Sequence, residues 1–289
     1  MRAFFLFTGL LAGSLVVAAA LTYPAWLLVG LISIEPVHRV MHRIAMLVAL
    51  IGLVVLTRRL GLSDRESLGY GLPGPIFRRQ FLTAWLAGFA LMLPLAALLL
   101  GLGIREVKPE LDMTLGALLG IFAAGVLSGL AVAFIEETFF RGVLYSAVAR
   151  SSGVAAAMVA PSLLYAALHF LGGRLRIPPE EVSWEHGFEV LANLFERYAE
   201  PLMLVDSLLA LFMLGILFSV LRLRTGAIAA CAGLHAAGVT TIAVLRETTA
   251  VNPEAAFGFL VGTYDGVIGW AALAWFGLLA AVYLRFSAR

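Results

Sequence analysis

Charged residues are scarce in this sequence. Only 13% of its 289 residues are Asp, Glu, Lys or Arg, whereas 62% are hydrophobic and the mean hydropathy is +0.98. A soluble globular domain carries roughly 25% charged residues, so a soluble fold is not expected. The formal net charge of +2 is too small and too evenly spread to indicate a nucleic-acid partner.

Cysteine is also nearly absent. The single cysteine, Cys231, lies inside an apolar stretch, which excludes an intramolecular disulfide and a metal site built from several thiolates. The sequence has no internal repeat and no pair of broken helices, and this argues against a transporter made of two related halves.

Long apolar runs, by contrast, are abundant. A membrane-spanning helix needs about 20 mostly apolar residues. On that scale the sequence predicts an all-α, polytopic membrane protein with about eight transmembrane helices, near residues 4–34, 44–57, 80–103, 114–150, 153–172, 202–221, 226–245 and 263–284. We expect the second run to gain a turn from Val37 to Arg43, and the fourth to tilt or project from the bilayer.

The N-terminal run imitates a signal peptide, because Arg2 precedes an apolar stretch that ends in small residues. Its apolar character continues through Pro24 to Ile34, which is too long for a signal sequence. We therefore expect an uncleaved first helix that is bent at Pro24.

Lys and Arg in the connecting segments predict the orientation. With the N-terminus inside, 12 of the 20 basic residues, including Arg289, lie on the cytoplasmic side, and 8, including Arg174, lie outside. The sequence thus predicts a multi-pass protein of the cell membrane with both termini cytoplasmic. Residues 1–113 would form N-terminal helices and a cytoplasmic loop, 114–245 the core, and 246–289 a C-terminal helix.

The long loop between residues 172 and 200 alternates aromatic and acidic residues at helical spacing. Trp184, Phe188, Leu191, Phe195 and Tyr198 would share one face. This pattern predicts an amphipathic helix on the membrane surface, either as a packing element or as a lid that docks the substrate.

A few ionisable residues occur inside the apolar runs, where each costs about 2.5 to 3.5 kcal/mol to insert. Glu137 and Arg141 have the i, i+4 spacing and order that favour a helical ion pair. Glu136 points about 100° away around the helix. We infer that Arg141 neutralises Glu137 and leaves Glu136 free to take a proton.

Two histidines are expected to reach the same region. A turn near Ser151 places Glu136 and His169 roughly 23 to 26 Å along two adjacent helices. A second turn at Arg222–Gly226 places His235 about 14 Å into a third helix. If the long fourth helix projects from the bilayer, the three helices converge on one polar site.

Such a cluster permits hydrolysis. A carboxylate in an apolar pocket suits general-base catalysis near neutral pH, one histidine can hold the attacking water, and the other can donate to an oxyanion. The alternative is a buried ion pair with two histidines that only fixes helix packing.

Three motifs in this region resemble those of the CAAX prenyl endopeptidase and bacteriocin-processing (CPBP) family. Glu136 to Arg141 resembles the EExxxR motif, and Tyr165 to His169 resembles FxxxH with Tyr in place of Phe. The segment from Leu214 to His235 is similar to the one that leads into HxxxN. The resemblance covers roughly Leu115 to Thr241.

The resemblance implies an intramembrane endopeptidase that acts on a peptide or membrane-protein substrate and needs no cofactor. By position, Glu136 would activate water with His169, Glu137 and Arg141 would support the site, and His235 would hold the oxyanion. We assign substrate binding to Tyr165, Phe140 and Thr240.

One position departs from the family pattern. Four residues after His235 the pattern expects Asn, whereas this sequence has Val239. A lost oxyanion donor costs about 100- to 1,000-fold in rate, although Thr240 or Thr241 could supply a hydroxyl. Two alternatives therefore stay open: a non-catalytic immunity or scaffold protein of the same fold, and a zinc-dependent protease that uses a His₂Glu ligand set.

Overall fold

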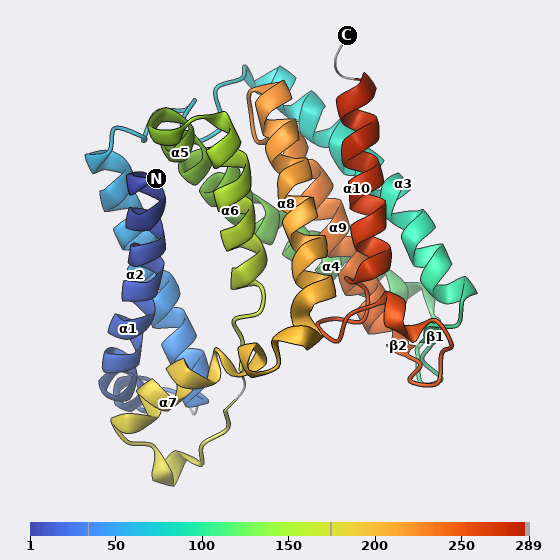
Figure 1. Cartoon of the computed structure of the whole chain (residues 1–289). Helices are drawn as coiled ribbons and strands as arrows, with labels where there is room; N and C mark the ends of the chain where they lie inside the picture. Colours follow the sequence, from blue (N-terminus) through green and yellow to red (C-terminus); the bar gives the residue numbers. More distant parts are fainter. Residues whose placement is uncertain (34, 174, 287–289) are drawn as a thin grey trace.

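The apolar runs of the sequence form helices that cross the molecule from end to end in the computed structural model, which describes residues 1–33, 35–173 and 175–286 (Figure 1). The long elements are α1 (Arg2–Gly30), α2 (Val37–Arg59), α3 (Gly74–Gly101), α4 (Leu115–Glu137), α8 (Val205–Thr225) and α9 (Ala229–Thr248). The helix α4 continues through η1 (Thr138–Leu144) into α5 (Tyr145–Ser152), and α6 (Val154–Leu168) and α10 (Trp270–Phe286) complete the set. Predictions at Ile34, Arg174 and Arg289 lie outside the described residues.

Six of the described helical stretches are long and apolar enough to span a membrane. The helices α6 and α10 are apolar but shorter, and they coincide with the fifth and eighth predicted segments. The second span gains the expected turn, because α2 begins at Val37. The all-α polytopic fold is confirmed.

Two predicted spans are shorter than expected. The fifth helix ends at Leu168, before Gly172 and Gly173, and the last begins only at Trp270. Glycines interrupt the residues ahead of Trp270, and Gly266 has φ +69°, a conformation that L side chains rarely adopt. The apolar composition of these segments thus extends past the helices into turns.

The start of α1 and the end of α10 lie at the same end of the bundle, which we call the terminal end (Figure 1). This agrees with an even number of spans. The assignment of that end to the cytoplasm stays a prediction.

A short antiparallel ribbon occupies the opposite end, which we call the ribbon end. Strand β1 (Arg105–Val107) pairs with β2 (Thr249–Val251), with Glu106 opposite Ala250. The Arg105 guanidinium is buried and donates to the carbonyls of Thr249 and Gly266. The ribbon therefore fixes the end of α9 and the loop that follows β2, and no apolar pattern in the sequence predicted it.

The amphipathic helix of the long loop is present but short. It spans α7 (Glu185–Asn193) and is flanked by the single turns η2 (Pro179–Glu181), η3 (Glu196–Ala199) and η4 (Pro201–Leu204), while η5 (Gly258–Leu260) lies after β2. Val190 and Leu194 pack on α1 and α2, and Trp184, Phe188 and Phe195 are exposed. The outward aromatic face fits a helix that lies at a membrane surface.

Small residues bring α9 against its neighbours. A Cβ at Gly129 would lie 2.5 Å from the Ala236 carbonyl, and one at Gly233 would lie 2.4 Å from the Phe81 carbonyl. Gly125 also lies against Thr240, whereas a Cβ at Gly116 or Gly120 would meet no described residue within 4 Å. Of these glycines in α4, Gly125 and Gly129 thus make the close contact with α9, and this contact positions His235 beside the glutamates.

Candidate active site

The helix that carries the two glutamates changes its hydrogen-bonding pattern directly after them. Residues Thr138–Leu144 form a π-helix, in which the Tyr145 amide donates to the Phe140 carbonyl five residues back. A π-helical turn holds an extra residue, so it rotates the side chains that follow relative to an α-helix, and such turns are frequent at functional sites. The sequence predicted an uninterrupted α-helix here.

Glu137 and Arg141 form the predicted buried ion pair. Arg141 Nη1 lies 3.1 Å from Glu137 Oε1, and the two side chains are 1% and 0% exposed. The guanidinium also lies 4.4 Å from the ring centroid of Tyr165 and 5.1 Å from that of Phe218. Aromatic faces attract a cation, so Arg141 is neutralised by one carboxylate and held between two rings.

His235 joins this pair, an arrangement that the sequence did not reveal. Its Nδ1 lies 2.8 Å from Glu137 Oε1, and hydrogen bonding to a carboxylate places the ring proton on Nδ1. The other nitrogen, Nε2, lies 3.8 Å from Glu136 Oε2. Glu137 thus orients the imidazole toward Glu136.

Glu136 takes no part in the ion pair, as predicted. Its side chain is 29% exposed, and its Oε2 is buried without a hydrogen-bond partner among the described residues. A buried, unpartnered carboxylate oxygen is costly in a folded protein. Water or a substrate group is the natural partner at this position.

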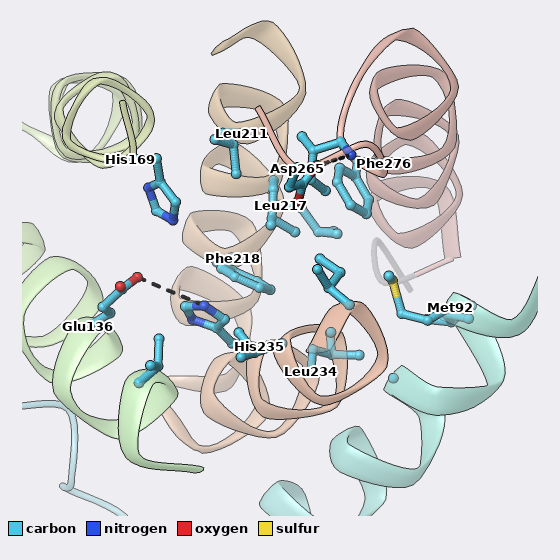
Figure 2. Close-up of a pocket in the computed structure, with 18 of the residues that line it drawn as sticks. Met92, Glu136, His169, Leu211, Leu217, Phe218, Leu234, His235, Asp265 and Phe276 are labelled. Carbon is cyan, nitrogen blue, oxygen red and sulfur yellow. Dashed lines mark hydrogen bonds and ion pairs between the residues drawn. The ribbon is translucent and has the colours of Figure 1, made fainter. Parts of the chain in front are cut away.

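His169 approaches the same point from α6. Its Nδ1 lies 2.7 Å from the Tyr165 carbonyl, which can only accept a hydrogen bond, so Nδ1 donates and Nε2 of the neutral ring is an acceptor. Figure 2 shows His169 and Glu136 on the same side of a cavity, with His235 next to Glu136. The predicted convergence of α4, α6 and α9 is confirmed.

The cavity itself has a volume of about 380 Å³ and is mostly apolar. Besides the three helices above, α3, α8 and α10 contribute residues such as Met92, Leu211 and Phe276 (Figure 2). Mostly apolar pockets with a few convergent polar groups are typical ligand sites. The site is therefore enclosed by six helices rather than the three that the motifs indicated.

Residues 117–241 match the family model described as Rce1-like, type II CAAX prenyl endopeptidase. The match covers less than half of the chain and is confined to this segment. The resemblance predicted from the three motifs is confirmed, and at the family level the segment is of the CAAX-protease type, a family of membrane endopeptidases. The comparisons with curated proteins and with solved structures found no match.

Three predicted residues of the Rce1-like segment have different surroundings from one another. Tyr165 lines the cavity, whereas Phe140 packs on Tyr165 in the core, with ring centroids 5.3 Å apart. Thr240 is fully buried and donates to the Ala236 carbonyl, and Thr241 donates to the Ala237 carbonyl. The Thr241 hydroxyl is thus used within α9, and the Thr240 hydroxyl is shared between α9 and the Gly125 carbonyl of α4. Neither residue lines the cavity in place of an asparagine side chain.

A loop outside the Rce1-like segment supports its first motif. The Tyr70 hydroxyl lies 2.7 Å from Thr138 Oγ1, and a Cβ at Gly142 would meet the Leu68 carbonyl at 2.4 Å. Arg222 also donates to the Arg141 carbonyl. These contacts brace the π-helix from α8 and from the loop after α2, which is why a local motif could not predict them.

The ribbon end of the cavity holds polar residues that the sequence reading missed. Arg246, Tyr264 and Asp265 all line it. Burial raises the pKa of the Asp265 carboxyl, although its hydrogen bonds from the Val267 and Ile268 amides oppose that shift. In the sequence, one indication of these residues was available, the position of Arg246. It follows His235 by eleven residues and therefore lies on the same face of the helix.

Proposed function

We propose that this protein is an intramembrane endopeptidase that hydrolyses a peptide bond with a water molecule activated by Glu136. The observation that carries the proposal is the unpartnered Glu136 oxygen at the edge of the cavity, beside His235 and across from His169. The Rce1-like family supports the same reaction class.

The side chains can be given roles in one sequence of steps. Glu136 and the Nε2 of His169 accept the two hydrogens of a water, which positions its oxygen toward a carbonyl carbon. Glu136 takes one proton as the water attacks, and then passes it to the amide nitrogen as the carbon–nitrogen bond breaks. The products are a carboxylic acid and an amine.

His235 and its partners support these steps. Glu137 fixes the ring through Nδ1, and Arg141 balances the charge of Glu137. His235 can donate to an oxyanion from Nε2 only when both ring nitrogens carry a proton, a form that two flanking carboxylates would balance. Its role as the oxyanion donor is part of the proposal.

A metal-dependent version of the reaction makes a different prediction. Among residues 1–33, 35–173 and 175–286, no group of three or more His, Cys, Asp or Glu side chains is arranged to hold a metal ion. We expect the purified protein, reconstituted in lipid vesicles, to cleave members of a membrane-peptide library equally well before and after chelator treatment. Full loss of cleavage that Zn²⁺ restores would instead support a His₂Glu zinc site.

Val239 lines the cavity one helical turn beyond His235. The variant Val239→Asn adds an amide donor there, and we expect it to raise the cleavage rate by up to about 100-fold if an oxyanion donor is missing. The matched variant Val239→Leu adds no donor and should leave the rate within about threefold of wild type. An equal rate in Val239→Asn, with an unchanged melting temperature, would mean that the donor does not limit the reaction.

The alternative of a non-catalytic peptide-binding protein rests on the same residue. That protein would bind members of the library in the cavity but release no fragments, and Val239→Asn would be the variant in which cleavage could first be detected.

A further inference from the structure

The side chain of Tyr165 lies among the groups that the proposed reaction uses. Its ring centroid is 4.4 Å from that of His169, one helical turn later on α6, and 6.1 Å from that of His235 on α9. The guanidinium of Arg141 lies over the same ring, and the ring of Phe140 packs against it at a steep angle. These contacts need only an aromatic ring, so a phenylalanine would supply all of them.

The hydroxyl is the part of Tyr165 that these contacts leave unused. The residue lines the cavity although it is only 1% exposed, and its hydroxyl makes no hydrogen bond within the part of the chain that the structure describes. A hydroxyl that leaves water without gaining a partner is costly in a folded protein. This hydroxyl is therefore placed for a partner that enters the cavity.

The other polar groups beside Glu136 present acceptors. His169 donates from Nδ1 to the Tyr165 carbonyl, so its Nε2 accepts. His235 likewise donates from Nδ1 to Glu137, and in the neutral ring its Nε2 accepts as well. An oxyanion that forms beside Glu136 thus meets lone pairs and a carboxylate, unless His235 is doubly protonated or another donor is present.

Other donors that line the cavity lie farther away or are already engaged. Ser128 precedes Glu136 by eight residues, or about 12 Å along α4, and Arg246 lies about three turns beyond the catalytic end of α9. The Trp275 indole donates to a backbone carbonyl of α3. The ring of Tyr264 contacts one of the two histidines, from the ribbon end. The Tyr165 ring contacts both histidines.

Two departures from the motif patterns fall on this cavity. The pattern FxxxH has Phe where this sequence has Tyr165, and HxxxN has Asn where it has Val239. The first departure adds a hydroxyl donor and the second removes an amide donor, and both residues line the cavity. The gain of one donor can therefore offset the loss of the other.

We propose that the Tyr165 hydroxyl donates a hydrogen bond to the oxyanion of the tetrahedral intermediate and replaces the donor that Val239 lacks. The hydroxyl keeps its proton, and the proton of the attacking water still passes through Glu136 to the amide nitrogen. A phenol donates without being charged, so the oxyanion needs no doubly protonated histidine. This role rests on the proposed endopeptidase function.

The first test is Tyr165→Phe, which keeps the ring and removes only the hydroxyl. With purified protein in vesicles and a cleaved member of the peptide library, we expect kcat to fall by about 100- to 1,000-fold, as for a lost oxyanion donor, while KM stays within about threefold. The matched control is Tyr145→Phe, which removes a buried hydroxyl that has no partner among the described residues and lies outside the cavity. It should keep the wild-type kcat, and both variants should keep the wild-type melting temperature.

A second substitution tests whether the two positions serve the same oxygen. In the Tyr165→Phe protein, Val239→Asn should raise kcat at least about tenfold more than it does in the wild type, because donors that serve one atom are not additive. Such a rescue also shows that the Tyr165→Phe protein is folded. A gain of equal size in both proteins would overturn the replacement of one donor by the other.

A binding measurement reports on the oxyanion without turnover. The probe is the same peptide with a phosphinate in place of the scissile amide, which mimics the tetrahedral intermediate and is not cleaved. Because transition-state analogues bind more tightly than substrates, we expect Tyr165→Phe to weaken phosphinate binding by about 10-fold or more. Binding of the parent peptide, measured in the Glu136→Gln protein, should be unaffected by Tyr165→Phe.

The outcomes separate this role from the function on which it rests. Cleavage by the wild type with an unchanged kcat in Tyr165→Phe overturns the role of Tyr165 alone, and so does an equal loss in Tyr145→Phe. A larger loss in Tyr264→Phe than in Tyr165→Phe assigns the donor to the other tyrosine and overturns the role as well. A wild type that cleaves no peptide and binds the phosphinate no better than the parent contradicts the endopeptidase function itself, and the role of Tyr165 is then contradicted with it.

Discussion

Glu136→Gln is expected to lower the rate of peptide cleavage by about 100- to 10,000-fold, the range that a positioned general base contributes. Glutamine keeps the size of the side chain but cannot take a proton from water. The measurement is the release of fragments from a membrane-peptide library by purified protein in vesicles, with wild type and variant assayed side by side.

The same substitution should leave the fold intact. Among the described residues, Glu136 Oε2 has no hydrogen-bond partner, and Glu136 contributes no charge to the buried ion pair, so the substitution removes no strong interaction. The matched control is Glu110→Gln, an exposed position in the loop before α4, which should cleave at the wild-type rate. An unimpaired Glu136→Gln protein would remove this residue as the base and favour His235, which has its own carboxylate partner.

Arg141→Met is expected to destabilise the protein by about 3 to 5 kcal/mol, because it leaves the Glu137 carboxylate buried without a countercharge. It also removes a cation from between the rings of Tyr165 and Phe218. The measurement is the unfolding midpoint in detergent. It is read from the amount of monodisperse protein that is recovered after heating to each temperature.

A double variant separates packing from chemistry at this pair. Glu137→Gln with Arg141→Met leaves no buried charge, and replacing a buried ion pair with neutral groups of similar volume is often neutral for stability. We expect the double variant to recover most of the lost stability but not the cleavage rate, because the carboxylate that orients His235 is gone. A double variant that is both stable and active would show that the pair serves packing alone.

Local patterns in the sequence were sufficient for several parts of the site. The Glu137–Arg141 ion pair follows from i, i+4 spacing. Glu136 takes no part in that pair because it lies on another face of the helix. The meeting of His169 with Glu136 was predicted from distances counted along two adjacent helices, because the helical rise is constant.

Other parts depend on how helices rotate against one another. The π-helix after Glu137, the bond from His235 to that carboxylate, and the polar ribbon end of the cavity have no local signature. Thr240 illustrates the limit: it lies one residue after Val239, but the 100° step turns its hydroxyl toward α4 and away from the cavity.

The pattern of apolar runs and motifs in the sequence was enough to predict an all-α membrane protein, a segment of the CAAX-protease type, and two glutamates and two histidines at similar depth. It could do so because a bilayer demands long apolar helices and makes each buried charge conspicuous. The packing of the helices, by contrast, sets which nitrogen of His235 meets which carboxylate, and it encloses one cavity between six helices that reaches Arg246. Those features arise where close contacts at glycines such as Gly129 and Gly233 set the rotation of α9, and packing of that kind involves residues far apart in the chain.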